Sequence, residues 1–152
     1  MVPEDRKIPF PQANDFKKIY DLICLEDETK LQDKDFLKEY LSLGTERQIS
    51  YYLSACEFLG IISREKRYTD VGLKIRKANI DLKVLMIGKL IISLPVFGEV
   101  FLMNYLYKER SSLEDIAQLI SMIYDIDNYE VCKRRASTVN KWLEWLEDQI
   151  II

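Results

Sequence analysis

The chain has 152 residues, of which 48% are hydrophobic and 31% are charged, so it suits one or two small globular domains and not a disordered tail. Its formal net charge is −3, which argues against a protein that coats nucleic acid regardless of sequence, because such proteins are usually basic overall. A site-specific binder with its basic residues gathered on one face is compatible with this charge.

The sequence predicts a cytoplasmic protein with no membrane partner. Residues 1–7 are highly charged and no apolar core follows them, so no secretory signal is expected. The run Val84–Tyr107 is the one stretch that suggests a membrane span, but charged residues and a proline interrupt it. The three cysteines lie far apart at apolar helical positions and are expected to be reduced core thiols: Cys24, Cys56 and Cys132.

The first residues, 1–13, are expected to form an extended arm because their three prolines exclude helix. A first winged-helix unit is predicted over residues 14–80. Asn14 and Asp33 are expected to cap its first two helices, and Gly44 to end the second.

A third helix is predicted from Thr45, because Thr45 and Gln48 have the T-x-x-Q spacing of a capping box. Its apolar seam has helical spacing and comprises Ile49, Tyr52, Cys56 and Leu59. Gly60 is expected to end the helix. The residues that follow predict a two-stranded hairpin with a basic tip, and then a fourth helix capped by Thr69.

The second half, residues 81–152, predicts a helical linker and a second winged-helix unit. Asp81 is expected to cap an apolar helix, Leu82–Ser93, that is buried on nearly all sides. A further helix is expected to begin at Pro95. Ser111 and Glu114 have the spacing of a second capping box. The predicted helices that follow are Leu113–Met122 and Val131–Glu147.

The second unit is predicted from an internal repeat, in which Thr45–Ile62 matches Lys133–Ile152 at a shift of 87 positions. The seam of the last helix, Ala136, Val139, Leu143 and Leu146, repeats the seam spacing of the third helix at the same shift. Residues 149–152 then predict the first strand of a second wing with no return strand. We therefore expect a mainly α protein with two winged-helix units and a small β-hairpin wing, its second wing truncated in a fragment of a longer protein.

Double-stranded DNA is the predicted partner, because basic and polar residues fall at the start of each predicted recognition helix and on the wing. Arginine pairs with guanine and glutamine with adenine in the major groove, while serine and tyrosine suit phosphate contacts. The candidate DNA-binding residues are Arg47, Gln48, Tyr51, Arg64, Lys66, Arg67, Lys133, Arg134, Arg135, Ser137, Thr138 and Lys141. The cluster between Lys133 and Lys141 is the most basic in the chain and is the first choice for contact.

Catalytic residues are not predicted in this chain. It has no histidine, no Cys-x-x-Cys pair and no glycine-rich phosphate loop. We accordingly expect no metal site and no cofactor within these residues.

The segment "E-F-L-G-I-I…R-Y-T-D-V-G-L-K-I" resembles the signature of winged helix-turn-helix DNA-binding domains. Together with "R-R-A-S-T-V-N-K-W-L-E-W-L" it resembles the DNA-recognition region of type II restriction endonucleases, especially the type IIS group. The resemblance implies site-specific recognition here and Mg²⁺-dependent cleavage in a separate nuclease domain. Two alternatives remain open, a dimeric winged-helix transcriptional regulator and a winged-helix scaffold that binds protein.

Overall fold

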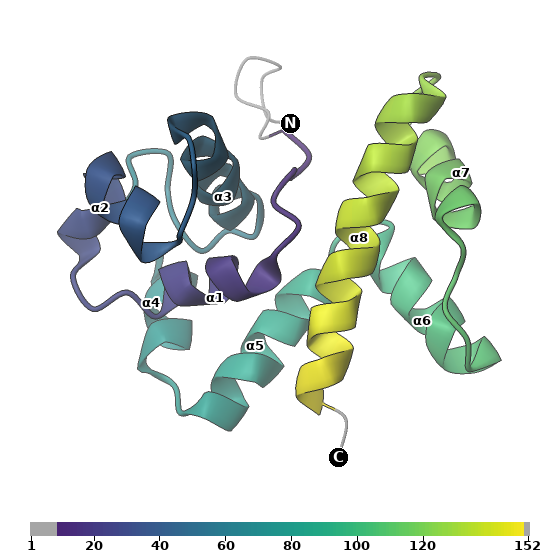
Figure 1. The fold of residues 1–152 in the computed structure, drawn as a ribbon. Coiled ribbons are helices and arrows are strands. Elements are labelled where there is room, and N and C mark those ends of the chain that lie inside the picture. Colours follow the sequence, from purple (N-terminus) through teal and green to yellow (C-terminus); the bar gives the residue numbers. More distant parts are fainter. Residues whose placement is uncertain (1–8, 151–152) are drawn as a thin grey trace. The chain divides into compact units, whose positions relative to one another are not determined.

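The computed structural model describes residues 9–150, and within them the protein is mainly α, as predicted (Figure 1). Within these residues two compact units are formed, one by residues 9–13 and 17–77 and the other by residues 14–16 and 78–150. Most of the predicted arm lies outside the described residues. The elements in chain order are α1 (Phe16–Ile23), the 3-10 helix η2 (Glu28–Gln32), α2 (Lys34–Tyr40), α3 (Glu46–Phe58), α4 (Asp70–Lys77), α5 (Ile80–Ile92), α6 (Phe97–Tyr107), α7 (Leu113–Tyr124) and α8 (Tyr129–Ile150).

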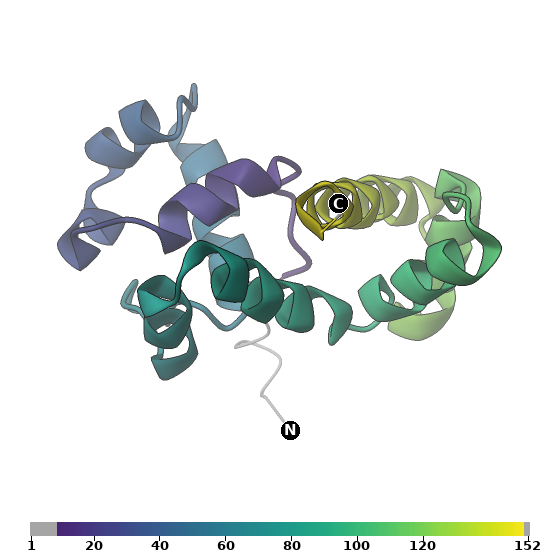
Figure 2. The same ribbon diagram turned by 90° about the horizontal axis from the view of Figure 1, so that it is seen from below.

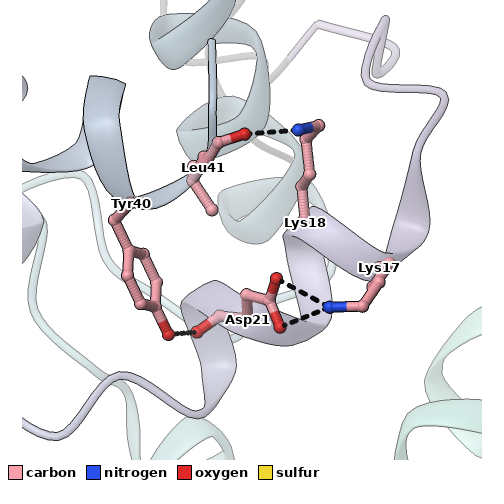
Figure 3. Close-up of polar contacts among 5 residues, drawn as sticks. All are labelled: Lys17, Lys18, Asp21, Tyr40 and Leu41. Atoms are coloured by element: carbon pink, nitrogen blue, oxygen red, sulfur yellow. Dashed lines mark hydrogen bonds and ion pairs between the residues drawn. The ribbon is translucent and has the colours of Figure 1, made fainter.

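Polar contacts tie α1 to α2 in the first unit (Figure 3). The Lys18 ammonium donates to the carbonyl of Leu41, which follows the last residue of α2. The Tyr40 hydroxyl donates to the carbonyl of Asp21 on α1 at 3.0 Å, and the Asp21 carboxylate accepts from Lys17 at 3.2 Å. A helix end leaves carbonyls without partners, so the cation at Leu41 satisfies one of them and holds the end of α2 in place.

Two predicted caps are confirmed. Asp33 accepts a hydrogen bond from the Phe36 backbone at 3.0 Å, and Thr45 accepts one from the Gln48 backbone at 3.2 Å. The reciprocal half of the predicted capping box is wrong, because the Gln48 side-chain oxygen accepts from the backbone N–H of Gly44 at 2.9 Å and not from Thr45. Helix α2 also ends at Tyr40, before Gly44.

The predicted seam of α3 is confirmed, since Ile49, Tyr52, Cys56 and Leu59 are all buried. Gly60 follows with φ of +78°, a left-handed conformation that glycine adopts without steric cost. The chain can therefore leave α3 in a sharp turn.

The segment after Gly60 is a hairpin turn closed by one antiparallel bridge between Ile62 and Tyr68. The Ser63 N–H donates to the Arg67 carbonyl at 2.7 Å, which supports the bridge. The prediction of a two-stranded wing is wrong in that form, because the residues from 9 to 150 include no β-strand. We call residues 61–69 the basic turn.

Helix α4 begins directly against the base of this turn. The Thr69 hydroxyl accepts from the Gly72 N–H at 3.0 Å, which confirms Thr69 as the predicted cap. A Cβ atom on Gly72 would lie 2.1 Å from the Ile61 carbonyl oxygen. The glycine is thus required by the close approach of α4 to the backbone of the basic turn.

In the second unit α8 packs against α5, α6 and α7, and both views show α7 running beside α8 (Figures 1 and 2). The predicted seam of α8, Ala136, Val139, Leu143 and Leu146, is buried. The Trp142 ring is fully buried and lies 5.3 Å from the ring of Phe97 and 5.1 Å from that of Phe16. These aromatic rings form the centre of the unit.

Two predicted caps in this unit are wrong by one or two residues. Asn79, not Asp81, caps α5 by accepting from the Leu82 N–H at 2.9 Å. Ser112, not Ser111, caps α7 by accepting from the Asp115 N–H at 3.1 Å. In each case a neighbouring residue of the same capping type competes for the position, and the sequence alone does not rank them.

Helices α5 and α6 meet at a tight corner around Val96, which has φ of +76°. The Glu99 carboxylate accepts from the Val96 N–H at 2.5 Å and holds this conformation. No single helix in residues 9–150 is long and apolar enough to cross a membrane. Helices α5 and α6 reach that length and composition only when taken together, and the chain bends by 105° between them. The prediction that α5 is buried on nearly all sides is wrong, because Leu82 and Leu85 are exposed.

Helix α8 begins at Tyr129 and continues to Ile150. The predicted first strand of a second wing is therefore wrong for Gln149 and Ile150, which are helical. The remaining two residues of that strand, Ile151 and Ile152, lie outside the described residues.

Candidate nucleic-acid interface

Helix α3 presents a polar face along its first two turns. Arg47, Gln48 and Ser50 are exposed and Tyr51 is half-buried, while the seam on the opposite side is buried. The helical spacing that sends the seam inward places these side chains outward together. The predicted positions therefore share one accessible surface.

Arg47 is held in place by Tyr51, one turn further along the helix. Its Nε donates to the Tyr51 hydroxyl at 2.6 Å, and its guanidinium lies 5.5 Å from the centre of the Tyr51 ring. A guanidinium carries five N–H donors, and this contact uses one of them. The others are available on an exposed side chain whose geometry is already restricted, which suits bidentate recognition of a guanine edge or a phosphate.

Gln48 does not fit the predicted role of an adenine reader. Bidentate pairing with adenine needs the side-chain oxygen and nitrogen to point outward together, and the hydrogen bond from the Gly44 N–H directs the oxygen back toward the start of α3. Gln48 therefore serves the start of α3, and Arg47 and Tyr51 remain as the candidates on this helix.

The basic turn is fastened to α3 by an ion pair. Lys66 Nζ lies 3.1 Å from Glu57 Oε2, and both side chains are largely buried. Lys66 adopts a left-handed conformation with φ of +62°, which places it at the corner of the turn. Lys66 thus positions the turn, and its charge is largely neutralised by Glu57 instead of being presented to a ligand.

Arg64 and Arg67 are the exposed cations of the basic turn. Arg64 has no ion-pair partner in the part of the chain that the structure describes, and Arg67 is 3.8 Å from Glu28 in a loose, exposed pair. Exposed pairs of this kind contribute little energy, so Arg67 can exchange Glu28 for a phosphate at low cost. These two residues are the ones on the turn that suit backbone contact.

Tyr68 anchors the other end of the turn in the core of the first unit. Its hydroxyl donates to the Leu22 carbonyl at 2.6 Å, and its N–H donates to Glu28 at 2.9 Å. Burial raises the pKa of Tyr68 well above its ordinary value, and the Arg76 guanidinium, 4.9 Å from the ring, opposes that rise. Glu57 and Glu28, which hold the turn, were not among the predicted site residues because each partner is distant in sequence.

On α8 the predicted basic cluster is only partly accessible. Lys133, Arg134 and Lys141 are exposed, and Arg135 and Ser137 are half-buried. Arg135 lies near Tyr124 on α7: burial raises the pKa of that tyrosine and Arg135 opposes the rise. Three of the six predicted residues therefore face solvent fully.

Thr138 is wrong as a DNA-contacting residue. It is 2% exposed, and its hydroxyl donates to the Asn14 side chain at 2.6 Å within the second unit. It lies one turn before Trp142, which is fully buried, so the two share an inward side of the helix. A buried threonine with a satisfied hydroxyl has a structural role.

The start of α8 also differs from that of a recognition helix. Because α8 begins at Tyr129, Lys133 and Arg134 lie a full turn inside it, and Asp125, Asp127 and Glu130 surround its beginning. Recognition helices contact bases chiefly through their N-terminal residues. The second unit holds 12 acidic and 8 basic residues against 13 and 14 in the first when residues 1–8 are counted with it, so the electrostatic balance favours the first unit for DNA contact.

A metal-binding cluster of three or more histidine, cysteine or acidic residues is not found in residues 9–150. The Cys56 thiol lies in the core of the first unit, where burial raises its pKa to about 12. A thiol held in its protonated form is a poor nucleophile and a poor metal ligand. The candidate interface therefore consists of Arg47 and Tyr51 on α3 with Arg64 and Arg67 on the basic turn.

Comparison with known proteins places the chain in one family. Residues 18–151 match the model of a domain of unknown function (DUF7226), and the chain belongs to that family. Searches of curated proteins and of solved structures gave no match.

Proposed function

We propose that this member of the DUF7226 family recognises double-stranded DNA through a winged-helix-like surface on its first unit. The observation that carries the proposal is the Arg47–Tyr51 pair, which holds an exposed guanidinium in position on the first turns of α3. The Lys66–Glu57 ion pair keeps the basic turn attached to the same helix. Helix α3 can therefore offer a base contact while the basic turn, held to the same helix, offers phosphate contacts.

In this proposal α3 enters the major groove and Arg47 reads a base edge, while Tyr51 limits the rotamers of Arg47. Preorganisation of this kind lowers the entropy lost on binding. Arg64 and Arg67 contact phosphates beside the groove and fix the register of α3. Phosphate contacts position a protein on DNA, whereas base contacts give sequence preference.

The charge distribution favours specific over indiscriminate binding. Glu46 stands beside Arg47, and Glu57 neutralises Lys66, so the surface carries few unpaired cations. Non-specific affinity rises with the number of phosphates neutralised. We therefore expect weak binding to random DNA and a clear gain on a preferred sequence.

The resemblance to type II restriction endonucleases supports a wider proposal, in which this chain supplies recognition and a separate Mg²⁺-dependent nuclease domain supplies cleavage. The exposed cations of α8, Lys133, Arg134 and Lys141, would then give a second, weaker contact with the DNA backbone. The site residues proposed here do not depend on that wider context.

The proposal is tested by selecting duplexes from a randomised pool with the full chain and sequencing the bound fraction. We expect one enriched motif, and Arg47→Ala should lower affinity for it by about 5- to 150-fold, which corresponds to about 1–3 kcal/mol for a base-reading arginine. Lys89→Ala is the matched control, because it removes one exposed charge from α5 in the other unit. A pool with no enriched motif, or equal losses in the two variants, would contradict the proposal.

A further inference from the structure

Helix α6 is apolar on two opposite faces. Phe97 and Val100 are fully buried in the second unit. On the other side Leu102, Tyr105 and Leu106 are exposed by 55%, 73% and 62%, and their spacing places them on one stripe. A helix that is apolar all round is typically covered on both sides.

A groove adjoins this stripe at the C-terminal ends of α6 and α8. Its volume is about 340 Å³, and its apolar lining comprises Phe101, Tyr105 and Ile150. Lys108 and Glu109 lie at its rim, beside an internal ion pair in which Arg110 is 2.9 Å from Glu147. The exposed apolar surface is therefore continuous with a concave site that has a polar edge.

The exposed apolar area is a large part of what a stable protein interface buries. A standard interface buries about 800 Å² per partner, of which about 57% is non-polar, or roughly 450 Å². A tyrosine contributes on the order of 200 Å² and a leucine on the order of 100 Å² when fully buried. At the exposures given above, the stripe together with the exposed Ile150 supplies on the order of 300 Å², about two thirds of this apolar area.

The charges at the rim of the groove would be complementary between two copies of the chain. Within residues 9–150 neither Lys108 nor Glu109 has an ion-pair partner, and the two carry opposite signs at adjacent positions. In a two-fold interface Lys108 of one copy can face Glu109 of the other and the reverse, so two ion pairs form at once. A lipid surface would instead favour an excess of basic residues, whereas α5 and α6 carry two basic and two acidic residues.

From the exposed apolar area and the charges at the rim we propose that the α6 stripe and its groove form the interface of a homodimer. The inference does not depend on DNA binding, since it concerns the second unit alone. Burial of Tyr105 at the centre of the interface makes it the principal contact, with Leu102 and Leu106 beside it.

Sedimentation equilibrium of the full chain tests the proposal. The wild-type protein should be dimeric at micromolar concentration, and Tyr105→Asp should raise the dimer dissociation constant by at least about tenfold, the loss expected of a central aromatic contact. Met122→Asp is the matched control, because Met122 is 78% exposed on α7 of the same unit and lies off the stripe. Circular dichroism of each variant verifies that it is folded.

A charge exchange provides an independent test at the rim. Glu109→Lys should weaken the dimer, because lysines would then face each other, and adding Lys108→Glu to it should restore association. A monomeric wild type, equal effects of Tyr105→Asp and Met122→Asp, or no restoration by the double variant would overturn the proposal. Binding of a monomeric chain to phosphatidylcholine or phosphatidylserine vesicles, abolished by Tyr105→Asp, would assign the stripe to a membrane surface instead.

Discussion

Substitution of Gly72 by alanine examines how the basic turn is held against α4. The added Cβ would lie 2.1 Å from the Ile61 carbonyl oxygen, where real contacts of this kind are essentially never below 3.0 Å. Helix α4 and the turn would have to separate by about 1 Å. A change of side-chain rotamer cannot relieve the clash, because the obstacle is the backbone of Ile61.

The magnitude follows from two opposing effects. Overpacking of this kind costs about 1–3 kcal/mol and occasionally more. Alanine regains about 1 kcal/mol over glycine in a helix interior. The close contact places the steric cost at the upper end, so we expect Gly72→Ala to lower the free energy of unfolding by about 2 kcal/mol.

Urea denaturation followed by far-UV circular dichroism measures this change. Gly44→Ala is the matched control, because its Cβ would meet the Gln48 side chain at an ordinary 3.6 Å. We expect the control to stay within about 0.5 kcal/mol of wild type, as for an unobstructed surface substitution. Equal stability of the two variants would refute the reasoning that α4 packs directly on the turn.

Three further predictions follow from buried or constrained residues. The pKa of Cys56 is raised from 9.0 to about 12, so its thiol ionises in the unfolded chain before it does so in the folded one, and the free energy of unfolding should fall above pH 9, by about 1.4 kcal/mol at pH 10. Denaturant titrations of Cys56→Ala should show a smaller fall over that pH range. The same pH dependence in both proteins would contradict a buried, protonated thiol. At Lys66, which has φ of +62°, the glycine variant should be about 1 kcal/mol more stable than the alanine variant in thermal unfolding, the reverse of the order in a helix. Thr138→Val should lower the free energy of unfolding by about 1 kcal/mol, because it removes the hydrogen bond to Asn14. Its DNA affinity in fluorescence anisotropy should equal that of the wild type. A loss of affinity would show that Thr138 contacts DNA.

The helical content and the buried seams could be predicted from the sequence because they depend on local spacing. The seams of α3 and α8 alternate with polar residues at a helical period, and that period alone decides which side faces the core. Thr45 and Thr69 cap as predicted, and each accepts from the backbone N–H three residues further on. Asn79 and Ser112 were missed because Asp81 and Ser111 compete nearby.

The remaining differences come from contacts that are distant in sequence. The exposed side of α6 was not predicted, because an apolar helix gives no sign of how many of its sides are covered within one chain. Lys66 was assigned to DNA, but its pairing with Glu57 depends on how the basic turn folds back on α3. Thr138 lies beside a seam residue, and only its hydrogen bond to Asn14 identifies it as internal.

The salt dependence of DNA binding tests the central claim most directly. Fluorescence anisotropy with the selected duplex, measured from 50 to 200 mM salt, gives the slope of log affinity against log salt concentration, which is about −0.9 for each phosphate contacted in B-form DNA. We predict that a double variant, Arg64→Ala with Arg67→Ala, makes this slope shallower by about 2 units, while Arg47→Ala weakens binding to the selected sequence and leaves the slope nearly unchanged. A slope that is the same in all three proteins, or an Arg47 variant as tight as wild type, would contradict DNA recognition by α3 and the basic turn.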